Sequence, residues 1–299
     1  MSARRALLGS AGIEGAKRVG RRELLELLWV ASCATLARSA IVPAAGLALS
    51  GGCSPAPPVG ASAGRAAGPP SRSAPVELWS FCDLPTDDPR SRELSGIAWD
   101  PTERVLWAVR DSSPTIVALV PDGELRTWRF GRTIEIDGGD LSDLEGLALV
   151  PGGFVVCSED GPRIIELDRT GRFRRDLPIP PRFRDARKNK AFESVAVSPS
   201  GRYLFTTTEV ALERDGPAPS ALAGTLVRIL RIDRHGGEPV EYVYATDPAL
   251  HEHGDWGVAD LVALGDDELL VLERGWSNGY GNTVRVYRTE LDARAICTH

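Results

Sequence analysis

Acidic residues recur at matching places along this 299-residue chain, in a pattern suited to metal binding or acid–base chemistry. Four similar stretches each lead, after a turn, into a second apolar run that ends on an acid. The stretches cover residues 93–99, 143–149, 191–197 and 257–263. The acids that end the second runs are Asp111, Glu159, Glu209 and Glu273, while Glu145 and Glu193 lie inside two of the stretches. Carboxylate oxygens are hard ligands that suit calcium, and carboxylates also accept protons in hydrolysis.

The spacing of these acids indicates a β-propeller. If Ser95, Glu145, Glu193 and Ala259 are equivalent, the acids follow at offsets of 16, 14, 16 and 14 residues. A period of about fifty residues with several short strands per unit is typical of propeller blades. A propeller gathers the equivalent ends of its blades around one mouth, so we expect the six carboxylates to converge there. They would repel one another unless cations intervened.

A simpler interpretation stays open for each acid taken alone. It is a solvated loop end, or it pairs with Arg110, Arg163 or Arg274. The basic run at residues 182–190 has the same two interpretations: a solvated charged face, or a set of contacts for an anionic substrate. Lys190 lies closest to the predicted mouth and is the best candidate for an anion contact.

From residue 76 onward the sequence predicts an all-β domain. Short apolar runs alternate with turns rich in Gly, Pro, Asp and Ser, and no convincing amphipathic helix of ten residues occurs there. Two motifs in this part imitate hydrolase signatures. Residues 275–279 match G-x-S-x-G around Ser277, but a strand pattern follows instead of a helix, which favours a hairpin loop. Residues 251–255 resemble a zinc motif without its final histidine, which favours a polar loop.

The first quarter of the chain has the composition of an export signal and a tether. Arg21 and Arg22 precede an apolar stretch that ends in small residues and Cys53, as in a twin-arginine lipoprotein signal over residues 1–53. A plain secretion signal or an uncleaved anchor is the alternative. Residues 54–75 predict a disordered linker and residues 76–299 the propeller. We therefore expect export to the periplasm, the cell envelope or the medium, with membrane contact only through the signal or a lipid.

The charge of the chain restricts its partners. The formal net charge is −6 overall, and residues 53–299 carry 28 basic and 38 acidic side chains. An acidic body argues against nucleic acid as a partner and fits a cation-binding exported protein. We expect a monomer that takes a small anionic or ester substrate.

The order of the motifs resembles the phytase-like domain (esterase-like activity of phytase) of exported bacterial proteins. The motifs are residues 94–97, 143–147, 158–164, 189–194 and 271–275. The resemblance covers roughly residues 78–292. Members of this family are understood as β-propellers related to calcium-dependent phytases. Relatives have about five to six blades and a further C-terminal Glu-Gly repeat. Because that repeat is missing here, we expect either a ring that is incomplete at the C-terminus or one that closes with the strand predicted at residues 76–81.

The resemblance implies a hydrolase of phosphate or carboxylic esters at the propeller mouth, where acids hold calcium and a bound water is activated. The metal ligands that we predict are Asp111, Glu145, Glu159, Glu193, Glu209 and Glu273. Glu145, Glu159 and Glu193 are the predicted catalytic residues, and Lys190, Arg274 and Arg163 the predicted substrate contacts. A non-catalytic propeller lipoprotein that binds a ligand or partner is the alternative, because propellers host many functions.

Overall fold

The structure is a computed structural model that describes residues 84–292 except 86, 124 and 140. The predicted signal, Cys53 and the linker lie outside the described residues. The described part consists of strands and three short 3₁₀ helices, which confirms the all-β prediction. The helices are η1 (Pro89–Ser91), η2 (Pro181–Asp185) and η3 (Glu213–Asp215). No helix in this part of the chain is long and apolar enough to cross a membrane.

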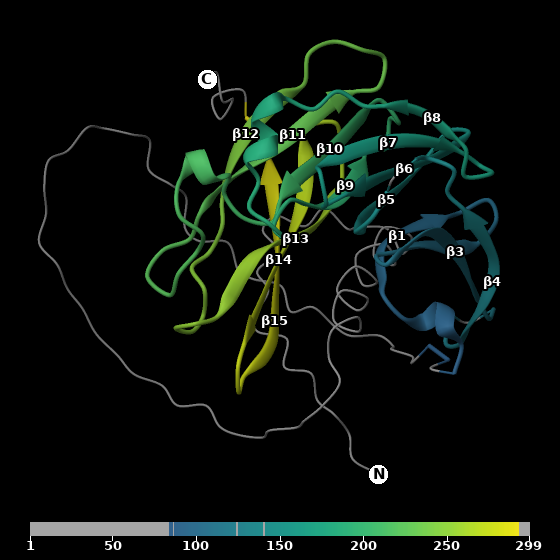
Figure 1. The fold of residues 1–299 in the computed structure, drawn as a ribbon, viewed down its shortest axis with the longest axis horizontal. Coiled ribbons are helices and arrows are strands. Elements are labelled where there is room, and N and C mark those ends of the chain that lie inside the picture. Colours follow the sequence, from purple (N-terminus) through teal and green to yellow (C-terminus); the bar gives the residue numbers. More distant parts are fainter. Residues whose placement is uncertain (1–83, 86, 124, 140, 293–299) are drawn as a thin grey trace, which may run out of the picture.

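Four antiparallel sheets follow one another along the chain in a propeller arrangement (Figure 1). Blade 1 contains β1 (Leu94–Asp100), β2 (Val105–Arg110), β3 (Ser113–Pro121) and β4 (Trp128–Glu135). Blade 2 contains β5 (Leu144–Val150), β6 (Gly153–Ser158), β7 (Arg163–Asp168) and β8 (Phe173–Asp176). Blade 3 contains β9 (Phe192–Val197), β10 (Tyr203–Thr208), β11 (Leu226–Asp233) and β12 (Val240–Ala245). Blade 4 contains β13 (Asp255–Ala263), β14 (Glu268–Ser277) and β15 (Gly281–Glu290).

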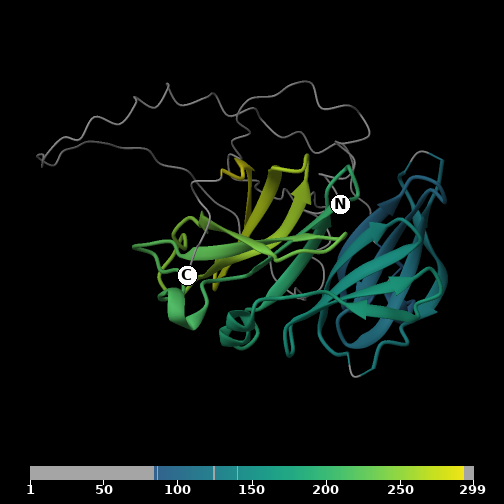
Figure 2. The same ribbon diagram turned by 90° about the horizontal axis from the view of Figure 1, so that it is seen from above.

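The first strand of each blade packs against the first strand of the next, in the order β1, β5, β9, β13. Figure 2 shows the blades fanned out in this order. The strands approach closely at two glycines. A Cβ on Gly96 would lie 2.5 Å from the Glu145 carbonyl oxygen, and one on Gly146 would lie 2.6 Å from the Val195 nitrogen. Backbone contact of this kind holds the starts of neighbouring blades together.

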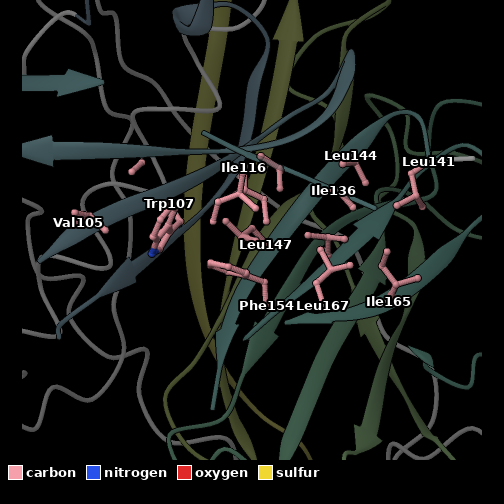
Figure 3. Packing of buried hydrophobic residues seen from close by; sticks show 14 residues of the cluster. Val105, Trp107, Ile116, Ile136, Leu141, Leu144, Leu147, Phe154, Ile165 and Leu167 are labelled. Carbon is pink, nitrogen blue, oxygen red and sulfur yellow. The ribbon is translucent and has the colours of Figure 1, made fainter. Parts of the chain in front are cut away.

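Each pair of neighbouring blades encloses a hydrophobic core. Strand β6 is buried along its whole length because successive side chains point to opposite faces of its sheet. Phe154 and Val156 enter the core shared with blade 1, whereas Val155 and Cys157 enter the core shared with blade 3. In the first of these cores the ring of Trp107 meets that of Phe154 edge-on, with centroids 5.4 Å apart (Figure 3).

The described residues form four blades, whereas relatives are expected to have five to six. Within the described residues, no packing joins blade 4 to blade 1 on the scale that joins the other neighbours. Ser277 ends β14 and is followed by a tight hairpin into β15, as the sequence predicted for the G-x-S-x-G segment.

Candidate functional site

The predicted mouth corresponds to one end of the blades, which we call the site rim. Here β1, β5, β9 and β13 begin and β2, β6, β10 and β14 end. A backbone hydrogen bond repeats at this end in blades 1 to 3, joining the acid after the second strand to the residue before the first strand. The bonds run from the amides of Asp111, Glu159 and Glu209 to the carbonyls of Glu93, Asp143 and Ala191, at 2.9, 2.9 and 3.0 Å. The three acids therefore occupy equivalent positions.

Glu159, Glu193 and Glu209 form the first of two acidic clusters, which we call the 2–3 acidic group because blades 2 and 3 supply it. One carboxylate oxygen from each lies within 4.8 Å of the others. Glu159 and Glu209 are buried and Glu193 is half-buried. The Ala191 amide donates a hydrogen bond of 2.8 Å to Glu159 Oε1, which fixes that carboxylate in the group.

Burial and the charges of neighbouring acids raise the pKa values of Glu159 and Glu193 in the 2–3 acidic group. Burial, with the nearby charges of Asp143, Glu145 and Glu209, raises the pKa of Glu159 to about 7. Burial and the charges of Glu209 and Glu145 raise the pKa of Glu193 well above its usual range, and the Glu193 and Glu209 carboxyl groups share a hydrogen bond.

Lys190 supplies a positive charge at the edge of the same group. Its Nζ atom lies 2.8 Å from Glu209 Oε1 and 2.7 Å from Asp255 Oδ2. Burial lowers the pKa of Lys190, but Glu209 and Asp255 raise it by more, so the amine stays charged. Lys190 therefore pairs with carboxylates in this structure.

Asp111, Asp143 and Glu145 form the second cluster, which we call the 1–2 acidic group. Their carboxylates also lie within 4.8 Å of one another. Glu145 is buried, and the Ser95 hydroxyl donates a hydrogen bond to its carboxylate. Asp143 has a φ of 55°, which few non-glycine residues adopt, and such strain is found at functional sites more often than elsewhere. The charge of Glu145 also acts on Glu159 and Glu193, so the two groups are electrostatically coupled.

Glu273 lies apart from both groups. Its carboxylate is buried in blade 4, where it accepts hydrogen bonds from Tyr244 Oη at 2.7 Å, the Asp247 amide at 2.9 Å and Trp256 Nε1 at 2.6 Å. In blade 2 the pair Leu144–Ser158 is 14 residues apart, whereas the equivalent pair in blade 4, Val258–Glu273, is 15 apart. Glu273 follows Ala259 by 14 residues, just as Glu159 follows Glu145, but the pairing in blade 4 is one residue longer. Glu273 therefore lies one position before the place that the rim acids occupy. A shift of one residue turns a strand side chain to the other face of the sheet.

The two predicted arginine contacts differ in position. Arg274 pairs with Gly257 in blade 4 and so occupies the place that Glu159 and Glu209 hold in their blades. Arg163 begins β7 at the same end of blade 2, but its side chain binds Asp176 on β8, with 2.7 Å between Nη2 and Oδ1.

Asp143 and Asp255 belong to the site although sequence reasoning did not single them out. Asp143 carried a signal, because an acid also stands at the equivalent position of the first stretch, Glu93. Asp255 belongs to the segment at residues 251–255 that was interpreted as a polar loop, and its contact with Lys190 could not be predicted because the two residues are 65 apart in sequence.

The chemistry of these side chains fits a divalent cation. Each group offers three hard oxygen donors in a confined space, as calcium and magnesium prefer. The raised pKa values of Glu159 and Glu193 indicate that few positive charges offset the negative charge of these two carboxylates. The structure thus contains two acidic clusters that can bind a metal ion.

Residues 89–296 match the family described as phytase-like, esterase-like activity of phytase. The chain belongs to the phytase-like family. This confirms the resemblance predicted from the motifs, and both acidic groups lie within the matched part of this phytase-like chain. No curated protein matches the chain.

Solved structures resemble this phytase-like chain only distantly. Hydrazine synthase of Kuenenia stuttgartiensis is 12% identical, with a TM-score of 0.37 over 69% of this chain and 51% of that chain. A protein from Lactobacillus plantarum is 15% identical, with a TM-score of 0.39 over 68% and 55%. The periplasmic gluconolactonase of Pseudomonas aeruginosa is 13% identical, with a TM-score of 0.35 over 66% and 72%. The chain thus spans about half the length of the first two, and none of these likenesses bears on function.

Proposed function

We propose that this chain is an ester hydrolase, acting on phosphate or carboxylic esters, whose site rim holds a divalent cation. The observation that carries the proposal is the 2–3 acidic group: three carboxylates within 4.8 Å of one another, largely buried, in a chain of the phytase-like family. Groups this close are costly to keep ionised, and a bound cation would offset that cost. Calcium is the ion that the flexible set of oxygen donors favours.

In this proposal the carboxylates have different roles. Glu159, Glu193 and Glu209 would hold one cation, and Asp111 and Asp143 would contribute to a second position. A bound cation would polarise the ester and lower the pKa of a water. Glu145 belongs to one group and acts electrostatically on the other, so we assign it the role of accepting a proton from that water. The Ser95 hydroxyl orients its carboxylate.

Two cationic side chains are placed to attract an anionic substrate. Lys190 lies beside Glu209, and Arg274 takes the rim position that acids occupy in the other blades. Once a cation neutralises Glu209, the Lys190 ammonium would become available to a phosphate or carboxylate oxygen. We also propose, from the N-terminal sequence, that the chain acts after export.

Hydrolysis of 4-nitrophenyl phosphate and 4-nitrophenyl acetate, with calcium and with a chelator, tests the proposal. We expect turnover that requires calcium and falls about 100-fold or more in Glu145→Gln, because the variant cannot accept the proton. The exposed Glu252→Gln is the matched control and should keep full activity. Calcium binding without turnover of either ester would favour the non-catalytic ligand-binding propeller instead.

A further inference from the structure

Two aromatic side chains of blade 4, Trp276 and Tyr280, are exposed near the site rim. Trp276 is 49% exposed and Tyr280 is 73% exposed. The ring of His251 stacks on that of Tyr280, with centroids 3.7 Å apart and planes 13° from parallel. We call His251, Trp276 and Tyr280 the aromatic lip.

The aromatic lip is connected to the 2–3 acidic group by a short series of contacts. Trp276 on β14 lies directly opposite Asp255 on β13. Asp255 Oδ2 lies 2.7 Å from Lys190 Nζ, which in turn lies 2.8 Å from Glu209 Oε1. Trp276 also stands two residues beyond Arg274, so both side chains leave the same face of β14. A ligand on the lip would therefore lie next to the proposed site.

The fold gives no reason for aromatic residues at these positions. The hairpin from β14 to β15 is closed by backbone pairing, including the Tyr280 amide bonded to the Ser277 carbonyl at 3.0 Å. The positive φ values of Gly279 and Gly281 shape the turn. Within the described residues, neither Trp276 nor Tyr280 belongs to the three cores between neighbouring blades or to the hydrophobic cluster inside blade 1. Large aromatic surfaces left in water beside a site are typical of ligand contacts.

We propose that the aromatic lip binds a ring in the substrate, so that the site prefers ring-bearing esters over small aliphatic ones. The ring is either aromatic or the apolar face of a sugar, because both stack on indole and phenol rings. This inference rests on the proposed function for the chemistry but concerns binding alone. Stacking of one ring adds about two- to tenfold in affinity.

Phosphonates are not hydrolysed, so their affinity for the protein tests ring binding independently of catalysis. Calorimetric titrations with calcium present would compare phenylphosphonate and a glucose phosphonate with methylphosphonate, which has the same anionic group and no ring. The proteins are the wild type, Trp276→Ala, Tyr280→Ala and Trp276→Phe. Phe173→Ala is the control, since Phe173 is also an exposed aromatic residue (42%) but begins β8, at the end of blade 2 opposite the site rim.

We expect one of the ring probes to bind at least threefold more tightly than methylphosphonate. That advantage should disappear in Trp276→Ala, shrink in Tyr280→Ala, and persist in Trp276→Phe and Phe173→Ala. The probe that shows the advantage identifies the ring as aromatic or sugar. The inference would be overturned by any of three results: all probes bind equally, the advantage persists in both alanine variants, or no ring probe binds. If ester turnover is normal in any of those cases, the proposed function stands without the lip.

Discussion

The first two strands pair in the same antiparallel way in blades 2 and 4, but the two blades have different side chains at the site rim. In blade 2 the position after the second strand is Glu159, a member of the 2–3 acidic group. In blade 4 the same position is Arg274, and the nearby acid Glu273 faces inward, where three donors bind it. A difference of one residue in the strand pairing therefore decides where the carboxylate lies. It is either available to a cation at the rim or hydrogen-bonded inside its own blade.

Among the variants considered for this comparison, removal of the Glu273 carboxylate should cause the largest loss of stability. Glu273→Ala would leave the Tyr244 hydroxyl, the Trp256 indole and the Asp247 amide without their acceptor in a buried place. We expect the free energy of unfolding to fall by about 3–5 kcal/mol, with or without calcium. Urea denaturation measures this loss. Glu252→Ala, an exposed control, should change stability by less than about 0.5 kcal/mol. A calcium-dependent loss in Glu273→Ala would place Glu273 at the rim after all.

The acidic groups should instead make stability depend on pH. The pKa of Glu159 is raised from 4.5 to about 7, so its contribution to stability is complete below pH 4.5 and is lost as the pH rises to 7. This shift corresponds to a loss of about 3 kcal/mol in the presence of a chelator. Urea denaturation at pH 5, 6 and 7 would show it.

Glu159→Gln should reduce that slope without removing it, because burial also raises the pKa of Asp260 to about 7. Calcium should flatten the slope, since a cation favours the ionised carboxylates. A chain that becomes more stable from pH 5 to 7 in chelator would contradict the description of the 2–3 acidic group.

The division of the chain into blades could be predicted from the sequence, because turn residues and the fifty-residue period are local signals. Convergence of Glu145, Glu159, Glu193 and Glu209 followed from that period and from propeller geometry. The place of Glu273 could not be predicted, because a hairpin one residue longer changes the face of a side chain while leaving the motif unchanged. The pairing of Lys190 with Asp255 was equally hidden, because it depends on how blades 3 and 4 pack together.

Lys190 provides a smaller test of how the 2–3 acidic group is neutralised. Lys190→Met would remove the ammonium that lies 2.8 Å from Glu209. In chelator we expect a loss of about 1–3 kcal/mol in the free energy of unfolding, because Glu209 stays buried without its partner. The rise in melting temperature on adding calcium should be larger than in the wild type. Lys188→Met, at an exposed lysine of the same loop, is the control and should behave as the wild type.

Arg163 should show the smallest effect. Its ion pair with Asp176 is exposed on both sides, and such pairs contribute about 0–1 kcal/mol. We expect Arg163→Ala to change stability by less than about 1 kcal/mol and to leave ester hydrolysis within about twofold of the wild type. A tenfold rise in KM would show that Arg163 leaves Asp176 to bind substrate, as the sequence first suggested.

In the proposed site the carboxylates of blades 2 and 3, and not the acid of blade 4, hold the cation. Calorimetric titration of calcium would compare three proteins: the wild type, the double variant Glu193→Gln/Glu209→Gln, and Glu273→Gln. Because ligand charge sets calcium affinity, we predict binding at least about tenfold weaker in the double variant and unchanged binding in Glu273→Gln. Equal affinities in the wild type and the double variant, or no calcium binding by the wild type, would contradict a cation site built by blades 2 and 3.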